Sequence, residues 1–456
     1  MIFVDSKIPV IKTDVNEITG DVVNRLINQH KRFRGRYKKN WDYYMGRHEI
    51  LHKTYADTSK PCNRIVLEIP QYIVAIKTGM MSGEPISLTS EDSEQLKVMN
   101  EILSYNDFHN LFSELDEISW VYGQAYTVTY IDSEGKIAIK AQTPETTFVV
   151  YDTTLDEKEK FGILYYDYVD EVTNDAKRKV DVYDDSYHYI FEGDLEKIEL
   201  VNVEEHYFGR VPVTEFYNYS NRRGGFENVI GIVDGLESII SDNIDTIDYF
   251  SDSYLMLKNL SGTTEEDILA MKKNRVMLVE EDGEAKFISP TINDNFNHNT
   301  IKALEENLYM IAKVPRLSDS SFSSNSSGTA LSYKLFGCEK DIDIKQNNFE
   351  KSFKKVFRLI NEVLNKKGYN FDVDKLSQVY TISLPNDMVS LADAVSKLRG
   401  TVSQETLLSQ LNFISSPALE MNRFRDEQEY NMKQMDIYND LSTQQNEVDV
   451  NEEAEE

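Results

Sequence analysis

A serine-rich loop between two helical segments constrains the fold of this chain more than any other feature. Apolar residues at helical spacing predict a helix from His298 that stops at Pro315, because proline cannot continue a helix. These apolar residues are Ile301, Leu304, Leu308 and Ile311. The loop SDSSFSSNSSG has one large apolar residue, Phe322, and a much longer helix is predicted over Thr329–Lys366. A polar loop in this position fits a spacer, a lid or a contact loop.

Length and charge limit the classes of protein to consider. A chain of 456 residues is too long for one core, so about two to four domains are expected. The net charge of −29 argues against a protein that grips nucleic acid without sequence preference, because such proteins present a basic face. An acidic protein past which nucleic acid slides remains compatible. We find no signal peptide and no apolar run long enough to span a membrane.

The sequence contains no pattern that requires an enzyme. Cys62 and Cys338 lie far apart and predict neither a disulfide framework nor a thiolate zinc site, which favours a reducing interior. A phosphate-binding loop, a dinucleotide-binding fingerprint and a nucleophile elbow are all absent. We therefore expect no catalytic residue, no cofactor and no metal.

The first half of the chain predicts an α+β domain. Helices are expected over Ser90–Tyr105 and Asp107–Tyr122. A hairpin and a series of alternating strands follow, namely AYTVTYI, KIAIKAQT, TFVVY, FGILYYDYV, RKVDVYD, SYHYIF and EKIELVNV. One long helix is then predicted over Asn228–Leu257, and a small α/β module with strands RVMLVE and AKFIS over Lys258–Asn295.

The predicted helix at Asn228–Leu257 is strongly acidic. Between Gly224 and Leu257 there are seven acidic residues and no lysine or arginine. The countercharges could come from other subunits, the acidic face could line a water-filled space, or it could be an ordinary solvated face. The sequence leaves these alternatives open.

The chain after the long second helix is predicted to be mainly helical. A strand, VYTISLP, comes first. Helices then follow over Met388–Leu398, over Gln404–Leu411 with Ser403 as its cap, and from Pro417 onward. The acidic C-terminal residues are expected to be disordered.

Two short stretches could carry chemistry. The segment His48–His52 reads HEILH and matches the zinc-hydrolase pattern HExxH, which needs both imidazoles on one face of a continuous helix. Gly46 precedes it and a predicted loop follows, so the favoured interpretation is a surface segment with coincidental histidines; Glu68 is the conceivable third ligand. The stretch Lys31–Lys39 has six basic residues mixed with aromatics, which fits a nucleic-acid adaptor. The favoured alternative is a helix whose cations pair with acids of the same protein.

Four segments in this order resemble the portal proteins of tailed double-stranded DNA bacteriophages of the siphophage type. They are YYMGRHEIL with NRIVLEIPQYIVAIKTGMMSGEPI, VIGIVDGLESIISDNIDTIDYF, VPRLSDSSFSSNSSGTALSYKL, and GTVSQETLLSQLNFISSPALEMNRFRDE. The resemblance covers nearly the whole chain. It also explains HEILH as a variant of a segment that is not catalytic.

The resemblance implies an α+β portal fold with defined parts. These are a wing (1–225), a first stem helix (226–257), a clip (258–296), a second stem helix (297–316), a tunnel loop (317–328), a long wing helix with a strand (329–385), a crown (386–440) and a disordered acidic tail (441–456). The implied assembly is a ring, usually a dodecamer, at one vertex of the virion capsid, after assembly in the host cytoplasm. Double-stranded DNA would enter through the ring during packaging and leave through it during ejection.

The resemblance also implies sites and partners. The candidates for lining the DNA channel are Lys302, Tyr309, Lys313, Arg316, Ser320, Ser321, Phe322, Ser323, Ser324, Asn325, Ser326 and Ser327. For the three basic residues, which we place on one helical face, salt bridges to neighbouring subunits are the alternative. The candidates for clip contacts are Lys272, Lys273, Arg275, Glu281 and Asp282. Expected protein partners are other copies of the chain, the terminase large subunit, the major capsid and scaffolding proteins, and a head-completion adaptor.

Overall fold

The computed structural model describes most of the chain. The described residues are 2–4, 8–58, 60–171, 173–251, 254–258, 264–267, 269, 284–288, 294–317, 328–381, 388–409, 411, 414, 417 and 419–432. The chain divides into two compact units, one formed by residues 1–320 with 334–383 and the other by residues 321–333 with 384–456.

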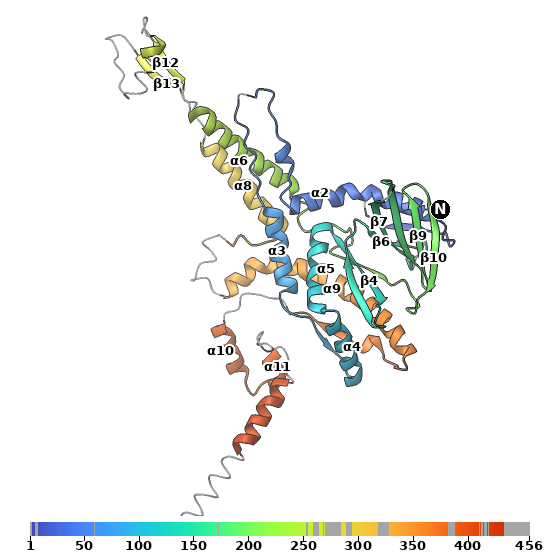
Figure 1. Cartoon of the computed structure of the whole chain (residues 1–456). Helices are drawn as coiled ribbons and strands as arrows, with labels where there is room; N and C mark the ends of the chain where they lie inside the picture. Colours follow the sequence, from blue (N-terminus) through green and yellow to red (C-terminus); the bar gives the residue numbers. More distant parts are fainter. Residues whose placement is uncertain are drawn as a thin grey trace, which may run out of the picture. The chain divides into compact units, whose positions relative to one another are not determined.

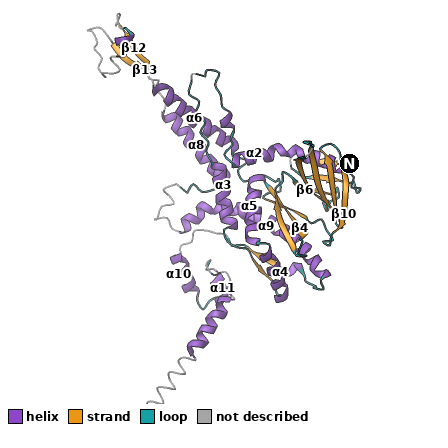
Figure 2. Ribbon diagram, viewed as in Figure 1, coloured by secondary structure: helices purple, strands orange, loops and turns teal. Residues whose placement is uncertain are grey.

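A seven-stranded sheet forms one layer of the first unit, in the order β1-β2-β6-β7-β8-β9-β10 (Figure 2). Its neighbouring strands are antiparallel, except that β2 and β6 are parallel. The strands are β1 (Ile2–Val4), β2 (Ile11–Thr13), β6 (Thr147–Tyr151), β7 (Glu159–Val169), β8 (Ala176–Tyr183), β9 (Tyr187–Asp194) and β10 (Ile198–Glu205). Helix α1 (Gly20–His30) begins after Thr19, whose hydroxyl accepts a hydrogen bond from the Val22 N–H. Its apolar face shares the buried core of this sheet.

A second, three-stranded sheet has the order β11-β4-β5, with β4 at Gln124–Ile131, β5 at Ile137–Gln142 and β11 at Val213–Tyr217. Helix α5 (Phe108–Tyr122) leads directly into β4 through Gly123, which has a φ of 92°. A Cβ atom at Gly123 would lie 1.9 Å from the carbonyl oxygen of Arg222. Only glycine therefore fits this connection.

Further helices pack around α5. They are α2 (Arg34–Tyr44), α3 (Ile69–Ser82) and α4 (Ser93–Tyr105), with short 3-10 turns at Lys31–Phe33 and Glu49–His52. Strand β3 (Ser87–Thr89) pairs with β14 (Ser377–Val379), which follows a 3-10 turn at Val373–Lys375. Helix α9 (Gly328–Lys366) contributes aromatic rings to the same core, with Phe353 packed edge-on against Phe108 and Phe216. These contacts join segments far apart in the sequence.

Helices α6 (Ile230–Ser251) and α8 (Asp294–Ala312) run side by side (Figure 1). Their apolar stripes face inward, so that Val233, Leu236 and Leu308 are buried. Strands β12 (Tyr254–Lys258) and β13 (Glu284–Ile288) form an antiparallel pair between the end of α6 and the start of α8 in the sequence.

The second unit contains helices α10 (Met388–Leu398) and α11 (Gln404–Ser409). The Ser403 hydroxyl accepts a hydrogen bond from the Thr406 N–H at 3.2 Å, which confirms the predicted cap. Residues 419–432 are also helical.

The structure confirms the mixed α+β class and much of the predicted order of elements. The hairpin at β4 and β5 and the five strands after it lie where alternation predicts them, and α9 matches its predicted bounds within a residue. Strands β1 and β2 were not predicted.

Three predicted elements were wrong in their bounds. The helix predicted over Asn228–Leu257 ends at Ser251, and Tyr254–Lys258 is a strand because it pairs with β13. The helix predicted to reach Pro315 ends at Ala312. The late strand lies at Ser377–Val379, earlier than VYTISLP, because its register with β3 fixes it there. The predicted strand RVMLVE, the loop at 318–327 and the tail at 441–456 lie outside the described residues.

Candidate functional site

The candidate site is the end of α8, just before the serine-rich loop. The sequence places Lys302, Lys313 and Arg316 on one helical face, and the structure shows this to be wrong. Helix α8 ends at Ala312, and Lys313 takes a left-handed backbone conformation with a φ of 56°. Because Pro315 cannot continue a helix, the chain turns here, and the two later cations point to different partners.

The four described candidates differ in how they are held. Lys302 is exposed, and no described residue contacts it through an ion pair or hydrogen bond. Tyr309 is half-buried, with its ring edge-on to Tyr72 at 6.1 Å between centroids. The Arg316 guanidinium lies over the Tyr309 ring and pairs with Glu305 at 2.8 Å. Both arginine contacts are within one chain, so no neighbouring subunit is needed to neutralise Arg316.

Tyr72 of α3 also fastens the backbone that leads into the loop. Its hydroxyl donates a hydrogen bond to the Pro315 carbonyl oxygen at 2.7 Å and accepts one from the Leu317 N–H at 3.3 Å. The last described residues before position 318 are therefore fixed to a helix of the first unit.

Lys313 joins a buried ionic network centred on Asp341 of α9. Its Nζ lies 2.6 Å from Asp341 Oδ1. The other carboxylate oxygen, Oδ2, accepts from Lys77 Nζ at 2.9 Å and from the Tyr219 hydroxyl at 2.7 Å. Burial by itself would raise the pKa of Asp341, but Lys77, Lys313 and Tyr219 together lower it. The carboxylate is therefore held in its charged form.

A second buried pair lies one helical turn along α9. Lys345 Nζ is 2.6 Å from Asp116 Oδ1 of α5, and both side chains are 0% exposed. Burial lowers the pKa of Lys345 to about 7, although Asp116 opposes this shift. Burial raises the pKa of Asp116, although Lys345 opposes it. Both Lys77 and Lys345 lie over the Trp120 indole, at 4.8 and 3.8 Å from the ring centroid.

The sequence analysis missed this network. Its signal was a charged residue at a core position of an apolar helical stripe, such as Lys77 in IVAIKTGMM and Lys345 between Ile342 and Phe349. A charge at such a position implies a buried partner, because an unpaired buried charge is too costly.

The remaining predicted channel and clip residues lie outside the described residues. They are Ser320, Ser321, Phe322, Ser323, Ser324, Asn325, Ser326 and Ser327 of the loop, and Lys272, Lys273, Arg275, Glu281 and Asp282 of the clip. Their proposed roles stay predictions.

The acidic residues of α6 find partners in the same chain. Tyr43 donates to Asp234 at 2.5 Å, and further partners lie within residues 48–67. Lys53 Nζ lies 2.8 Å from both Asp242 and Asp245, and Asn63 donates to Asp245 and Asp248. Burial would raise the pKa of Asp245, but Lys53 and Asn63 lower it to about 2. The alternatives drawn from the sequence were countercharges from other subunits, a water-filled space and a solvated face. None of them included these partners from the same chain.

The HEILH segment does not form a metal site in the structure. Its residues form a 3-10 turn instead of the continuous helix that two zinc ligands require. Both ring nitrogens of His48 are engaged, with Nδ1 at 2.5 Å from Glu237 and Nε2 at 2.8 Å from the Tyr43 carbonyl oxygen. His48 is buried, so its interpretation as a surface residue was wrong, while His52 is exposed. Among the described residues no group of three or more potential ligands could hold a metal ion.

Two residues of the basic stretch Lys31–Lys39 form ion pairs with acidic residues of the same chain. Lys31 pairs with Asp167 at 3.0 Å, and Arg36 pairs with Glu227 at 2.6 Å. These contacts favour the packed helix over the nucleic-acid adaptor.

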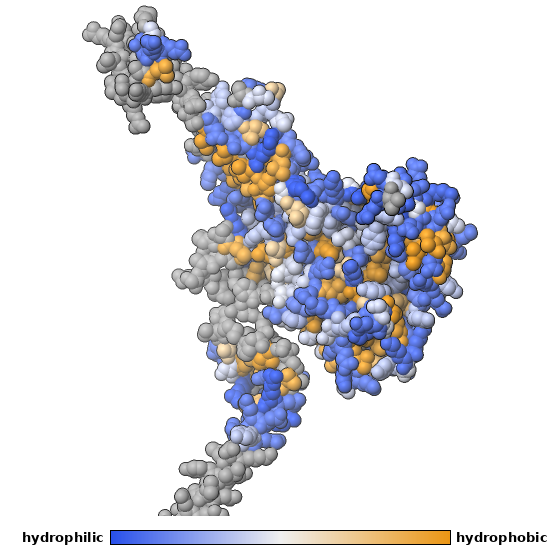
Figure 3. Space-filling view, in the orientation of Figure 1, coloured by the Kyte–Doolittle hydropathy of each residue, from blue (hydrophilic) through white to orange (hydrophobic). Residues whose placement is uncertain are grey.

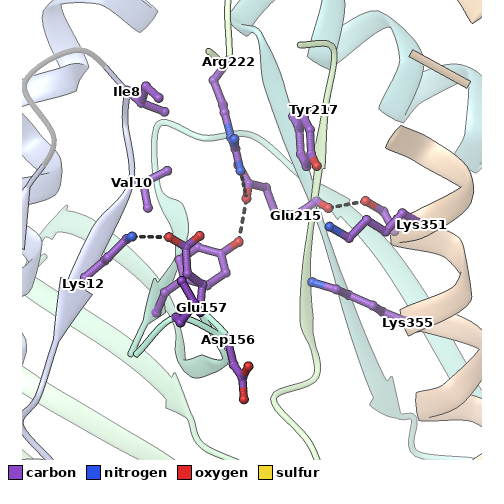
Figure 4. A pocket seen from close by; sticks show the side chains of 13 residues that line it. Ile8, Val10, Lys12, Asp156, Glu157, Glu215, Tyr217, Arg222, Lys351 and Lys355 are labelled. Atoms are coloured by element: carbon purple, nitrogen blue, oxygen red, sulfur yellow. Dashed lines mark hydrogen bonds and ion pairs between the residues drawn. The ribbon is translucent and has the colours of Figure 1, made fainter. Parts of the chain in front are cut away.

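A cavity of about 640 Å³ lies between the N-terminal strand segment, the β6–β7 turn and α9 (Figure 4). The buried Glu215 is at its centre, with Arg222 Nε at 2.9 Å and the Tyr151 hydroxyl at 2.6 Å. The Ser352 hydroxyl donates to the Glu215 carbonyl oxygen at 2.7 Å and ties α9 to β11. Because these polar groups hydrogen-bond to one another, we assign the cavity a structural role in holding α9 against β11.

The described part of the chain thus defines a mixed α+β protein with a helix pair, a long α9 and ion pairs that join α9 to α3 and to the residue after α8. None of its described helices is long and apolar enough to cross a membrane. The sequence profile of the family "Phage portal protein, SPP1 Gp6-like" matches residues 23–434. The chain belongs to this family of portal proteins, which are structural proteins.

Two individual similarities accompany the family match. The chain is 24% identical to the portal protein of Bacillus phage SPP1 over 451 residues, covering 91% of this chain and 87% of that protein. It is also similar to a chain in the neck of an empty GTA particle, with 10% identity and a TM-score of 0.45, covering 75% of this chain and 90% of the other. The zinc-hydrolase and adaptor alternatives receive no support from these comparisons.

Proposed function

We propose that this chain assembles into a ring, usually a dodecamer, at one vertex of a phage capsid, and that double-stranded DNA passes through the ring during packaging and ejection. The observation that carries the proposal is the match of the portal family profile to residues 23–434. A ring of identical subunits is a closed heterologous assembly, in which each copy uses two different surfaces.

Exposed apolar residues on the α6–α8 pair support such an assembly. Ile247 is 55% exposed and Met310 is 67% exposed, and Figure 3 shows hydrophobic surface over this helix pair. Apolar surface of this kind favours contact with another protein, and a neighbouring copy is the natural partner in a ring.

In this proposal residues 1–225 are the wing, 226–257 and 297–316 the stem, 258–296 the clip, 317–328 the tunnel loop and 329–385 the long wing helix and strand. Residues 386–440 are the crown, and 441–456 are an acidic tail. The clip contacts the terminase large subunit during packaging and a head-completion adaptor afterwards, and the major capsid and scaffolding proteins are further partners. Assembly takes place in the host cytoplasm.

The net charge of −29 suits a channel, because acidic residues repel phosphates and prevent the duplex from sticking. A few cations, repeated by symmetry, supply weak contacts. Lys302 is an exposed candidate whose side chain has no ion-pair partner among the described residues, and the polar loop residues Ser320–Ser327 approach the duplex without reading its sequence.

Deletion of Ser320–Ser327 tests the proposal. We expect rings to form normally in end views by electron microscopy, while the number of DNA-filled particles falls sharply. A matched deletion of eight residues from the tail, Asp449–Glu456, controls for chain shortening. Normal filling by the loop deletion would contradict the role of the loop, and the absence of rings from the unaltered chain would contradict the portal assembly.

A further inference from the structure

The network around Asp341 contains one cation more than it contains anions. Lys77 and Lys313 both contact Asp341, while Lys345 has its own partner, Asp116. Three lysines therefore face two carboxylates in this part of the described structure. The lysine in excess of the carboxylates is Lys313, which directly follows α8.

The two lysines on Asp341 are not equivalent. The side chain of Lys77 is 1% exposed and lies against Trp120, so it cannot reach solvent without disrupting the core. The side chain of Lys313 is 45% exposed. If Lys313 leaves, Asp341 keeps the Lys77 ammonium and the Tyr219 hydroxyl on Oδ2, so no buried carboxylate is left without a countercharge.

Arg316 shows the contrast. It forms a one-to-one pair with Glu305, and its guanidinium also lies over the Tyr309 ring. Removing Arg316 from this pair would leave Glu305 unpaired and lose the aromatic contact. The structure thus ranks Arg316 as the less readily released cation.

We propose that Lys313 is an exchangeable cation, which leaves Asp341 to contact a phosphate of the duplex and returns to Asp341 when the phosphate has moved on. This inference rests on the proposed function and adds a mechanism to it. Each contact is weak and reversible because the ammonium exchanges one anion for another, with Asp341 stabilised throughout by Lys77. Repetition around the ring would give the duplex many such short-lived contacts.

Three substitutions separate this role from a purely structural one. Lys313→Met removes the positive charge and keeps an unbranched side chain of similar length. It also keeps a non-glycine residue at a position with a left-handed backbone conformation. Lys340→Met is the matched control, because Lys340 is also on the exposed side of an ion pair, at 2.6 Å from Asp343. Lys77→Met removes the buried partner of Asp341.

The readouts are thermal unfolding of the purified chain and the fraction of DNA-filled particles in the phage that carries it. We expect Lys313→Met and Lys340→Met to unfold at nearly the wild-type temperature, and Lys77→Met to unfold well below it. Of Lys313→Met and Lys340→Met, we expect only Lys313→Met to lower the fraction of DNA-filled particles. We expect Lys313→Arg, which keeps the positive charge, to restore that fraction. An unfolding shift in Lys313→Met as large as that of Lys77→Met, or filling equal to that of Lys340→Met, would overturn the inference. Failure of the wild-type chain itself to form rings would instead count against the proposed function.

Discussion

The buried pair of Lys345 and Asp116 offers a direct test of how α9 is held in the first unit. Replacing Lys345 by Met leaves the Asp116 carboxylate, which is 0% exposed, without its countercharge. Breaking a buried ion pair from one side costs about 3–5 kcal/mol. The Lys345 ammonium also lies 3.8 Å from the Trp120 ring centroid, and a desolvated cation–π contact adds about 2 kcal/mol. From these two effects we expect Lys345→Met to lower the free energy of unfolding by about 3 kcal/mol or more.

The double variant Asp116→Asn/Lys345→Met decides whether the uncompensated charge causes that loss. It removes both charges and keeps an amide at position 116, so we expect it to recover most of the stability lost in Lys345→Met. Urea unfolding at fixed protein concentration measures this, followed by tryptophan fluorescence, to which Trp120 inside the network contributes. A loss below about 1 kcal/mol in the single variant, or no recovery in the double variant, would refute the reasoning.

Two further predictions concern the backbone and the acidic helix. Gly123→Ala should lower the free energy of unfolding by about 1–3 kcal/mol from backbone strain, with a further cost from the close approach to the Arg222 carbonyl oxygen. Gly35→Ala is the control, because no atom lies within 4 Å of its added Cβ. It should be neutral or slightly stabilising in the same unfolding assay. Lys53 and Asn63 lower the pKa of Asp245 to about 2 from its ordinary 3.8, so its contribution is fully present above pH 3.8 and is lost as the pH falls toward 2. Acid titration of Asp245→Asn should therefore show a shallower loss of stability in that window, and an unchanged profile would exclude this contribution.

Local patterns were enough to predict most elements of the first unit. Alternating residues in segments such as Thr147–Tyr151 predict strands because one face of each strand is buried. The cap at Ser403 follows from a hydroxyl side chain before a helical pattern. The strand at Tyr254–Lys258 was missed because its apolar residues continue the pattern of α6, and only the pairing with β13 distinguishes strand from helix.

The partners of charged residues could not be predicted from local patterns. The acidic residues of α6 have no lysine or arginine beside them in the sequence. Their partner Lys53 precedes Asp242 by 189 residues. Lys53 reaches Asp242 and Asp245, and His48 reaches Glu237. These contacts give Glu237, Asp242 and Asp245 of α6 partners in the same chain. Long-range pairing of this kind depends on the tertiary fold, which single-sequence periodicity does not contain.

The partners of the two cations that follow α8 also depend on the tertiary fold. Sequence spacing treats Lys313 and Arg316 as equivalent, because both would follow Lys302 on one helical face. The left-handed residue at position 313 breaks that equivalence, since it directs Lys313 toward the buried Asp341 and Arg316 back toward Glu305. Tyr72 fixes the intervening backbone to α3, while Asp341 is part of α9, which resumes after the loop. The segments on either side of residues 318–327 are therefore joined through the Lys313–Asp341 contact.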